Sequence, residues 1–181
     1  MDEAQLAESG ADGAITIAAR VHSGPAPGDA CLLANGSWSK QECTLLATSH
    51  DGGETFGEIT RNFGLFQPPG GCAPGLAADP AELGAGRLFF SNPASRTARE
   101  NMVVRCSTNS GKTWSAWDDP ATVKVYRGPA AYSCLSPLFP AERWGSQRVG
   151  LLYERDAPGC TGPSCAIHFA PISTQQRARP S

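Results

Sequence analysis

The sequence has no excess of one charge and no long apolar run, and these two absences exclude several classes of function. The formal net charge is −2, from 15 basic and 17 acidic residues. The chain has no surplus of positive charge to neutralise phosphates, so we expect no nucleic-acid partner. No stretch approaches the roughly 20 apolar residues that span a bilayer as a helix, so we expect no integral membrane segment.

Metal-ligand patterns are also missing. The seven cysteines include no Cys-x-x-Cys pair, and the three histidines form no cluster with the spacing of a zinc site. We therefore expect no metal and no other cofactor.

The sequence does not determine the cellular compartment of the protein. The acidic stretch Met1–Gln5 lacks the apolar core of a signal peptide, so any leader would lie upstream of it. Asn35 begins a glycosylation tripeptide, and Cys160 and Cys165 have the spacing of a small disulfide that an oxidising compartment would allow. These features favour a lysosomal or secreted protein slightly over a cytoplasmic one.

Glycine and proline are abundant and lie between short apolar runs. The 20 glycines and 15 prolines are spread along the chain. The runs between them have the length of β strands and are rich in branched and aromatic residues, and no long amphipathic helix is present. This pattern predicts an all-β fold with many turns. The predicted strands lie at 14–19, 43–48, 87–91, 102–107, 148–153 and 166–170.

Two segments repeat, and each follows a predicted strand. Ser49–Phe56 reads S-x-D-x-G-x-T-F and Ser107–Trp114 reads S-x-N-x-G-x-T-W, so the two starts lie 58 residues apart. The third residue can accept hydrogen bonds from turn amides, the glycine can take positive φ, and the aromatic residue should pack into the fold. A repeat of this length, with several strands in each unit, is typical of propeller blades and makes a chance match of two hairpins unlikely. The residues with this structural role are Ser49, Asp51, Gly53, Thr55, Phe56, Ser107, Asn109, Gly111, Thr113 and Trp114.

The repeat resembles the Asp-box of sialidases, which also occurs in other propellers and therefore indicates fold rather than function. A sialidase propeller has six blades, and a chain of this length would hold about three four-stranded antiparallel blades at roughly 40–50 residues each. The resemblance implies a partial six-bladed β-propeller, the C-terminal half of a sialidase catalytic domain, over residues 1–173. Residues 174–181 are expected to form a polar tail.

Four further segments resemble sialidases and follow one another in the order that this family uses. In the segment 3–20, the resemblance makes Glu3 the base that activates the nucleophile and Arg20 an arginine that binds the substrate carboxylate. In the segment 88–101, it makes Arg99 a second such arginine, with Arg96 as the competing candidate. Without the resemblance, Glu3 would be interpreted as a charged residue at a frayed terminus. Arg20 would be interpreted as a solvated residue at the end of a strand.

The last two segments complete the expected site. The segment Gly128–Leu135 resembles the one that contains the catalytic tyrosine, which falls on Tyr132. The segment Gly150–Arg155 resembles the one whose glutamate orients an arginine, which falls on Glu154. The alternative interpretation of Tyr132 is a tyrosine buried in the core, and that of Glu154 is an ordinary charged residue at the end of a strand.

These residue types suit the chemistry of sialic acid, which carries a carboxylate on its anomeric carbon. Arginine binds a carboxylate through planar, bidentate hydrogen bonds. A carboxylate nucleophile would be repelled by the substrate carboxylate, whereas a neutral tyrosine is not, and an adjacent glutamate can take its proton. The resemblance implies an exo-α-sialidase that removes terminal α-linked sialic acids from glycoproteins, oligosaccharides or gangliosides with retention of configuration.

Some parts of the family pattern have no counterpart in this sequence. A further clamp arginine and the aspartate acid/base belong to N-terminal blades, so we expect the 181 residues alone to be inactive. Asn109 replaces the usual aspartate, and the segment 71–76 departs from the Cys-x-Gly-Ser pattern. The alternatives are a non-catalytic Asp-box propeller that binds glycans or proteins, and a half-propeller that completes itself by self-association.

Overall fold

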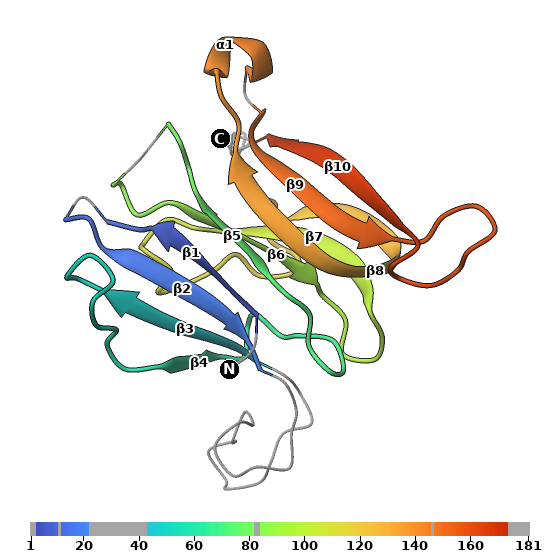
Figure 1. Cartoon of the computed structure of the whole chain (residues 1–181), viewed down its shortest axis with the longest axis horizontal. Helices are drawn as coiled ribbons and strands as arrows, with labels where there is room; N and C mark the ends of the chain where they lie inside the picture. Colours follow the sequence, from blue (N-terminus) through green and yellow to red (C-terminus); the bar gives the residue numbers. More distant parts are fainter. Residues whose placement is uncertain (1–2, 11, 22–42, 82–83, 146, 174–181) are drawn as a thin grey trace, which may run out of the picture.

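The computed structural model describes residues 3–10, 12–21, 43–81, 84–145 and 147–173, which form two antiparallel sheets (Figure 1). The glycosylation tripeptide at Asn35 and the predicted polar tail 174–181 lie outside the described residues. In the described part of the chain, no helix is long and apolar enough to cross a membrane.

The first sheet is an up-and-down meander in which each strand pairs with the next. Its strands are β1 (Ala4–Glu8), β2 (Ile15–Arg20), β3 (Thr44–Ser49) and β4 (Thr60–Asn62). The turn between β1 and β2 contains Gly13, whose φ of 74° is accessible to glycine without strain. Four strands in this order form one propeller blade, as the sequence predicts.

The second sheet has six strands in the order β10-β9-β8-β7-β6-β5. The short helix α1 (Ala141–Trp144) connects β8 to β9. The strands are β5 (Gly75–Ala78), β6 (Leu88–Pro93), β7 (Glu100–Ser107), β8 (Val123–Pro137), β9 (Gln147–Arg155) and β10 (Ala166–Ser173).

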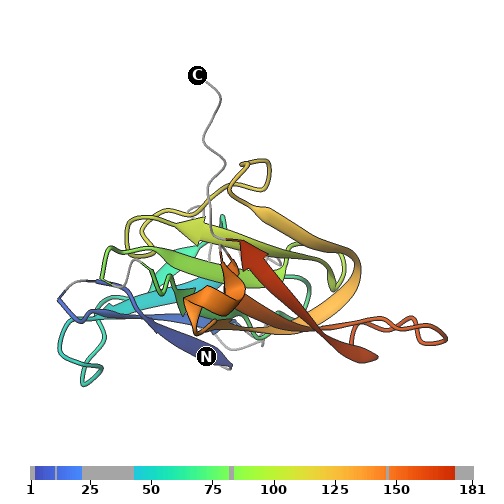
Figure 2. The ribbon, with the colours of Figure 1, turned by 90° about the horizontal axis from the view of Figure 1, so that it is seen from above.

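Strand β8 belongs to two blades. Residues from Val123 to Pro129 pair with β7, and residues from Ala130 to Pro137 pair with β9. The register shifts between Ala130 and Ser133, and Figure 2 shows the strand curving from one blade into the next. The six-stranded sheet therefore consists of a four-stranded blade, β5–β8, and a blade of three described strands, β8–β10. The prediction of about three blades is confirmed, although the third has one strand fewer than expected.

Apolar side chains from both sheets form the contact between the first and second blades. Phe90 and Leu65 are fully buried there, with Ala18, Leu46 and Leu76 around them. Burying one such large side chain stabilises the fold by about 1.5–3 kcal/mol. A second cluster lies within the six-stranded sheet and includes Met102, Val149 and Leu151.

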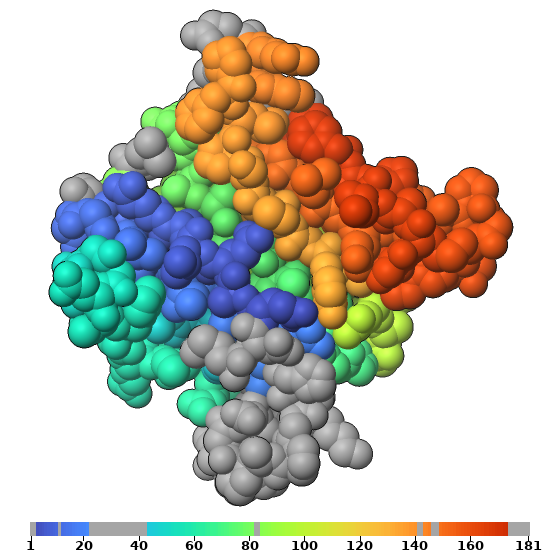
Figure 3. Space-filling view, in the orientation of Figure 1, coloured from blue at the N-terminus to red at the C-terminus, as the bar shows by residue number. Residues whose placement is uncertain are grey.

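The contact between the first and second blades also brings strands β1 and β5 together. The Gln5 side-chain oxygen accepts a hydrogen bond of 2.8 Å from the backbone nitrogen of Leu76, which joins β1 to β5. Figure 3 shows β1 and β2 (blue) on the same face of the molecule as β8–β10 (orange to red). Residues from the two ends of the sequence can therefore meet on this face.

Candidate functional site

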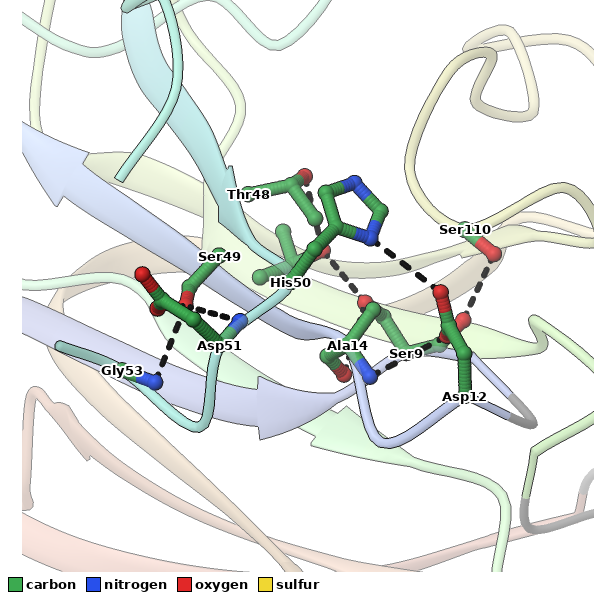
Figure 4. Close-up of polar contacts among 10 residues, drawn as sticks. Ser9, Asp12, Ala14, Thr48, Ser49, His50, Asp51, Gly53 and Ser110 are labelled. Carbon is green, nitrogen blue, oxygen red and sulfur yellow. Dashed lines mark hydrogen bonds and ion pairs between the residues drawn. The ribbon is translucent and has the colours of Figure 1, made fainter. Parts of the chain in front are cut away.

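The first Asp-box closes its hairpin with a small set of hydrogen bonds (Figure 4). Ser49 Oγ donates to Asp51 Oδ1 at 2.7 Å and accepts from the Gly53 nitrogen at 2.9 Å. Asp51 Oδ1 also accepts from the Thr55 nitrogen at 2.9 Å. The hydrogen bonds from Thr55 and Ser49 hold the pKa of the Asp51 carboxyl well below its usual range, because they favour its charged form.

The second hairpin reproduces this arrangement with asparagine. Ser107 Oγ donates to Asn109 Oδ1 at 3.0 Å and accepts from the Gly111 nitrogen at 3.0 Å, and Asn109 Oδ1 accepts from the Thr113 nitrogen at 2.9 Å. One bond is reversed. The Asn109 amide donates to Thr113 Oγ1, whereas Thr55 Oγ1 donates to Asp51 in the first hairpin. Asparagine keeps the two backbone bonds because its carbonyl oxygen can replace one carboxylate oxygen.

The aromatic residues of the two boxes differ. Trp114 is half-buried, packs edge-on against Phe90 with ring centroids 5.7 Å apart, and donates to the Gly111 carbonyl. Phe56 is 39% exposed, so the prediction that it packs into a blade is wrong. Trp114 borders the apolar cluster between the first two blades, whereas Phe56 belongs to none of the apolar clusters among the described residues.

The Asp-boxes lie away from the residues expected to bind substrate. Ser49 pairs with Ile15 at one end of β2, and Arg20 pairs with Thr44 at the other end. At the Asp-box end, the second hairpin contacts the first blade, because Ser110 Oγ donates to the Ser9 carbonyl at 2.6 Å (Figure 4). This geometry gives the second Asp-box hairpin a structural position at the contact between the first and second blades.

Glu3, Arg20 and Tyr132 come together at the opposite end of the strands. The pairing of β1 with β2 places Glu3 beside Arg20, whose backbone nitrogen donates to the Glu3 carbonyl at 2.9 Å. Arg20 Nη1 donates to the Glu3 carboxylate and also to Tyr132 Oη at 3.3 Å. Burial disfavours the charge on Arg20, but the hydrogen bonds with Glu3 and Tyr132 outweigh burial and raise its pKa.

Arg99 approaches the same tyrosine from the second blade. The Cζ atoms of Arg20 and Arg99 lie 5.7 Å and 5.6 Å from the centre of the Tyr132 ring. Arg96 instead stacks on Phe66, with its Cζ atom 4.4 Å from that ring centre. Of the two candidates in this segment, only Arg99 is brought to Tyr132.

A glycine pair supports both arginines. The Gly70 carbonyl accepts hydrogen bonds from Arg20 Nε, at 3.1 Å, and Nη2, and the Gly71 carbonyl accepts from Arg99 Nη2 at 3.0 Å. Gly71 has a φ of 61°, and a Cβ atom there would lie 2.8 Å from Arg20 Cγ. The contacts of Gly70 and Gly71 with the two arginines were not predicted from the sequence, in which the segment 71–76 is only a departure from the family pattern. The signal available was the run of turn formers Pro68-Pro69-Gly70-Gly71.

Buried polar residues fix the base of this glycine turn. The Gln67 side chain is 2% exposed; its amide donates to Thr44 Oγ1 at 3.0 Å, and its oxygen accepts from the Cys72 nitrogen at 3.2 Å. Burial raises the pKa of the Cys72 thiol to about 12, despite the nearby arginines. Cys72 is therefore a neutral packing residue at neutral pH and adds no charge beneath the site.

Glu154 contacts the nucleophile candidate instead of an arginine. Its Oε2 atom accepts from the backbone nitrogen of Tyr132 at 3.4 Å and from Ser164 Oγ at 2.8 Å. No hydrogen bond or ion pair joins it to an arginine side chain of the described residues, and its role in orienting an arginine stays a prediction. An open cavity of about 220 Å³ adjoins Tyr132 and Glu154.

Two other predictions concern groups outside this cluster. Cys160 and Cys165 form a disulfide in the connection between β9 and β10, as their spacing suggests. Within the described ranges, no group of three or more histidine, cysteine, aspartate or glutamate side chains is placed to bind a metal ion.

Comparison with known proteins finds sialidases among the proteins that are similar to this chain. No protein-family model matches the chain. A sialidase of Micromonospora viridifaciens is 33% identical over 112 residues, which are 60% of this chain and 16% of that protein. A leech intramolecular trans-sialidase structure is 21% identical, with a TM-score of 0.60 over 94% of this chain and 23% of its own.

Another solved structure gives a similar result. A Hadza microbial sialidase is 28% identical, with a TM-score of 0.56 over 83% of this chain and 24% of its own. The chain thus spans about a sixth of the length of the curated relative that it matches, and about a quarter of these two structures. Its sequence similarity, its Asp-box hairpins and its blade arrangement identify the chain as a homologue of sialidases with part of the sialidase β-propeller fold.

Proposed function

We propose that the chain is part of an exo-α-sialidase, a retaining glycoside hydrolase that releases terminal α-linked sialic acids from glycans. The observation that carries the proposal is the hydrogen bonding of Arg20 to both Glu3 and Tyr132, with Arg99 on the same tyrosine ring. These four residues come from three blades, and they are the ones whose roles the family resemblance predicts.

In the proposed reaction, Tyr132 Oη attacks the anomeric carbon while its proton passes to the Glu3 carboxylate. Both oxygens accept a hydrogen bond from the same nitrogen of Arg20, so the guanidinium links the carboxylate to the phenol and would stabilise negative charge on the phenolic oxygen. The glycosidic bond breaks, and the leaving oxygen takes a proton from a separate acid. Water then attacks the anomeric carbon and gives a proton to the conjugate base of that acid. The glycosyl–tyrosine bond breaks, and Glu3 returns the proton to Oη.

Arg20 and Arg99 would bind the substrate carboxylate beside the tyrosine. A guanidinium offers two parallel N–H groups to a carboxylate, and the Gly70 and Gly71 carbonyls fix the orientation of both side chains. Glu154 would fix the backbone of Tyr132 through its hydrogen bond to the nitrogen.

The family resemblance assigns no residue of this sequence to the acid that protonates the leaving group. We therefore propose that other blades of a longer polypeptide, or of an associated one, supply this acid and a further arginine. The second candidate function is a non-catalytic propeller that binds glycans, and the missing acid is the observation that favours it.

The test is release of sialic acid from sialyllactose by a polypeptide that contains residues 1–181 together with the missing blades. Tyr132→Phe should lower kcat by at least roughly 10³-fold, because the nucleophile is lost while the ring and its arginine contacts are kept. Arg127→Gln, which removes an exposed arginine outside the site, is the matched control and should leave kcat unchanged. Sialoside binding without hydrolysis by the complete propeller would support the non-catalytic alternative.

A further inference from the structure

Tyr132 lies at a β-bulge between β8 and β9. The register shift between Ala130 and Ser133 leaves two residues of β8 opposite the single residue Glu154 of β9, and Tyr132 is one of the two. Such a bulge interrupts the regular ladder and changes the direction of the side chain that it carries. The Tyr132 nitrogen donates to Glu154 Oε2 at 3.4 Å. The backbone of the candidate nucleophile therefore depends on where the Glu154 side chain lies.

Ser164 holds the Glu154 carboxylate in this position. Its Oγ atom donates to Glu154 Oε2 at 2.8 Å, the same oxygen that accepts from Tyr132. Among the described residues, no other hydrogen bond or ion pair holds this carboxylate. A glutamate side chain has several rotatable bonds, so without Ser164 it would sample other rotamers. One charge-assisted hydrogen bond therefore selects the rotamer that contacts Tyr132.

The disulfide in turn holds Ser164. The connection between β9 and β10 extends beyond the ends of the strands (Figure 1). Its first half is anchored, because Asp156 bonds to β8 through its backbone nitrogen at 3.3 Å and its side chain at 2.5 Å. Ala157 and Cys160 then exchange backbone hydrogen bonds of 3.0 Å and 2.9 Å. The bond from Cys160 to Cys165 ties the second half of the loop, which contains Ser164, to this anchored turn.

We propose that Ser164 is a positioning residue for Tyr132 and that the Cys160–Cys165 disulfide keeps it in place, so that reduction of this bond lowers the activity of the site. A dithiol supplies the two electrons and two protons: its own sulfurs form a disulfide, and the Cys160–Cys165 bond breaks into two thiols. Residues 161–164 then lose their link to the anchored turn, and Glu154 loses its partner. The effect on activity rests on the proposed function, whereas the effect on the Tyr132 backbone does not.

Hydrogen exchange of the Tyr132 amide, followed by NMR in the isotopically labelled 181-residue chain, tests the positioning without any turnover. Ser164→Ala should make this exchange about 2–10-fold faster, as expected for the loss of one hydrogen bond. Ser164→Thr keeps the hydroxyl and should restore slow exchange. The matched control is Thr161→Ala, which removes an exposed hydroxyl of the same loop that makes no hydrogen bond with the described residues, and should leave the exchange unchanged.

Reduction should have the same effect as the loss of Ser164. Dithiothreitol should make the Tyr132 exchange faster in the parent chain. Because Cys43 is also disulfide-bonded, the double variant Cys160→Ser/Cys165→Ser, which keeps that cysteine, isolates the effect of the loop. This variant should exchange as fast as the reduced parent, and dithiothreitol should not change it further.

The effect on activity is measured in a polypeptide that also contains the missing blades. Ser164→Ala should lower kcat roughly 3–10-fold and leave KM unchanged, because a misplaced nucleophile slows the chemical step more than substrate binding. Ser164→Thr should recover kcat, and Thr161→Ala should leave it unchanged.

Several results would overturn the proposal. One is unchanged exchange at Tyr132 in both Ser164→Ala and the double cysteine variant. Faster exchange in the double variant but not in Ser164→Ala would show that the disulfide acts without Ser164. An active propeller whose kcat is the same in Ser164→Ala would remove the role in activity. Faster exchange in Ser164→Ala, together with a complete propeller that has no sialidase activity, would contradict the proposed function and support the positioning of Tyr132.

Discussion

At the scale of single residues, the arrangement of the candidate site depends on close packing as much as on charge. Gly71 illustrates this, because its backbone carbonyl contacts Arg99 while its missing side chain leaves room for Arg20. Glycine is required there both by the positive φ and by the lack of space.

Gly71→Ala should destabilise the chain by about 1–3 kcal/mol, through left-handed strain and the contact with Arg20 and the Val21 carbonyl. Urea unfolding at neutral pH measures this change. The matched control is Gly145→Ala, which has a similar φ of 58° but no atom within 4 Å of the added carbon, and should cost less. Equal losses for the two variants would show that packing against Arg20 contributes nothing.

Asp51 should make stability depend on pH in the acidic range. Its pKa is depressed in the folded chain by hydrogen bonds from Thr55 and Ser49, so its contribution is present above the unfolded pKa of about 3.9. The contribution is lost as the pH falls from there through the folded pKa. Asp51→Asn, which mimics Asn109 of the second hairpin, should therefore lose less stability than the parent between about pH 4 and pH 2. Unfolding curves over this range measure the difference, and parallel curves would contradict the prediction.

At the scale of secondary-structure elements, β9 and β10 present two different faces. Tyr153 and Leu151 are buried on one face, whereas Leu152, Ile167 and Phe169 are exposed on the other. Leu152 lies directly opposite Phe169 in the ladder, and Ile167 lies two residues along the same face of β10. The outer face of this blade is therefore apolar and exposed in the described structure.

The Cys160–Cys165 disulfide closes the connection between these two strands. Replacing both cysteines by serine should lower the free energy of unfolding by about 2 kcal/mol, since the bond restricts a short loop in the unfolded chain. Thermal unfolding of the parent chain and of this variant, both without reductant, provides the measurement. The loss of the bond should also loosen Ser164, which lies inside the loop and donates to Glu154. Equal unfolding temperatures for the parent chain and the variant would contradict this expectation.

At the scale of the whole molecule, the described blades leave apolar surface and strand edges that another part of a propeller would cover. Exposed apolar patches and open edges promote association between chains. The isolated 181-residue chain should therefore form dimers or larger species as its concentration rises, as detected by analytical ultracentrifugation. Ile167, which is 74% exposed, is the most accessible member of the patch. Ile167→Lys should shift the chain toward monomer, and Lys112→Gln, outside the patch, serves as the control.

Much of the fold was predictable because it depends on local chemistry. Strand-length apolar runs, the two Asp-box repeats and the Cys160–Cys165 spacing each led to a feature that the structure contains. The exposure of Phe56 was not predictable in this way, because the same residue pattern is buried or exposed according to what packs beside its blade.

The sequence by itself determined the identity of the blades and the chemical groups available, because turns, strand periodicity and residue type are local properties. Only the tertiary structure decided which groups meet. Tyr132 lies 112 residues from Arg20, and their contact depends on the packing of the first blade against the second and on the passage of β8 into the third. The choice of Arg99 over Arg96 and the support from Gly70 and Gly71 likewise arise from long-range packing. Such contacts follow from how whole blades fit together, which no short stretch of residues encodes.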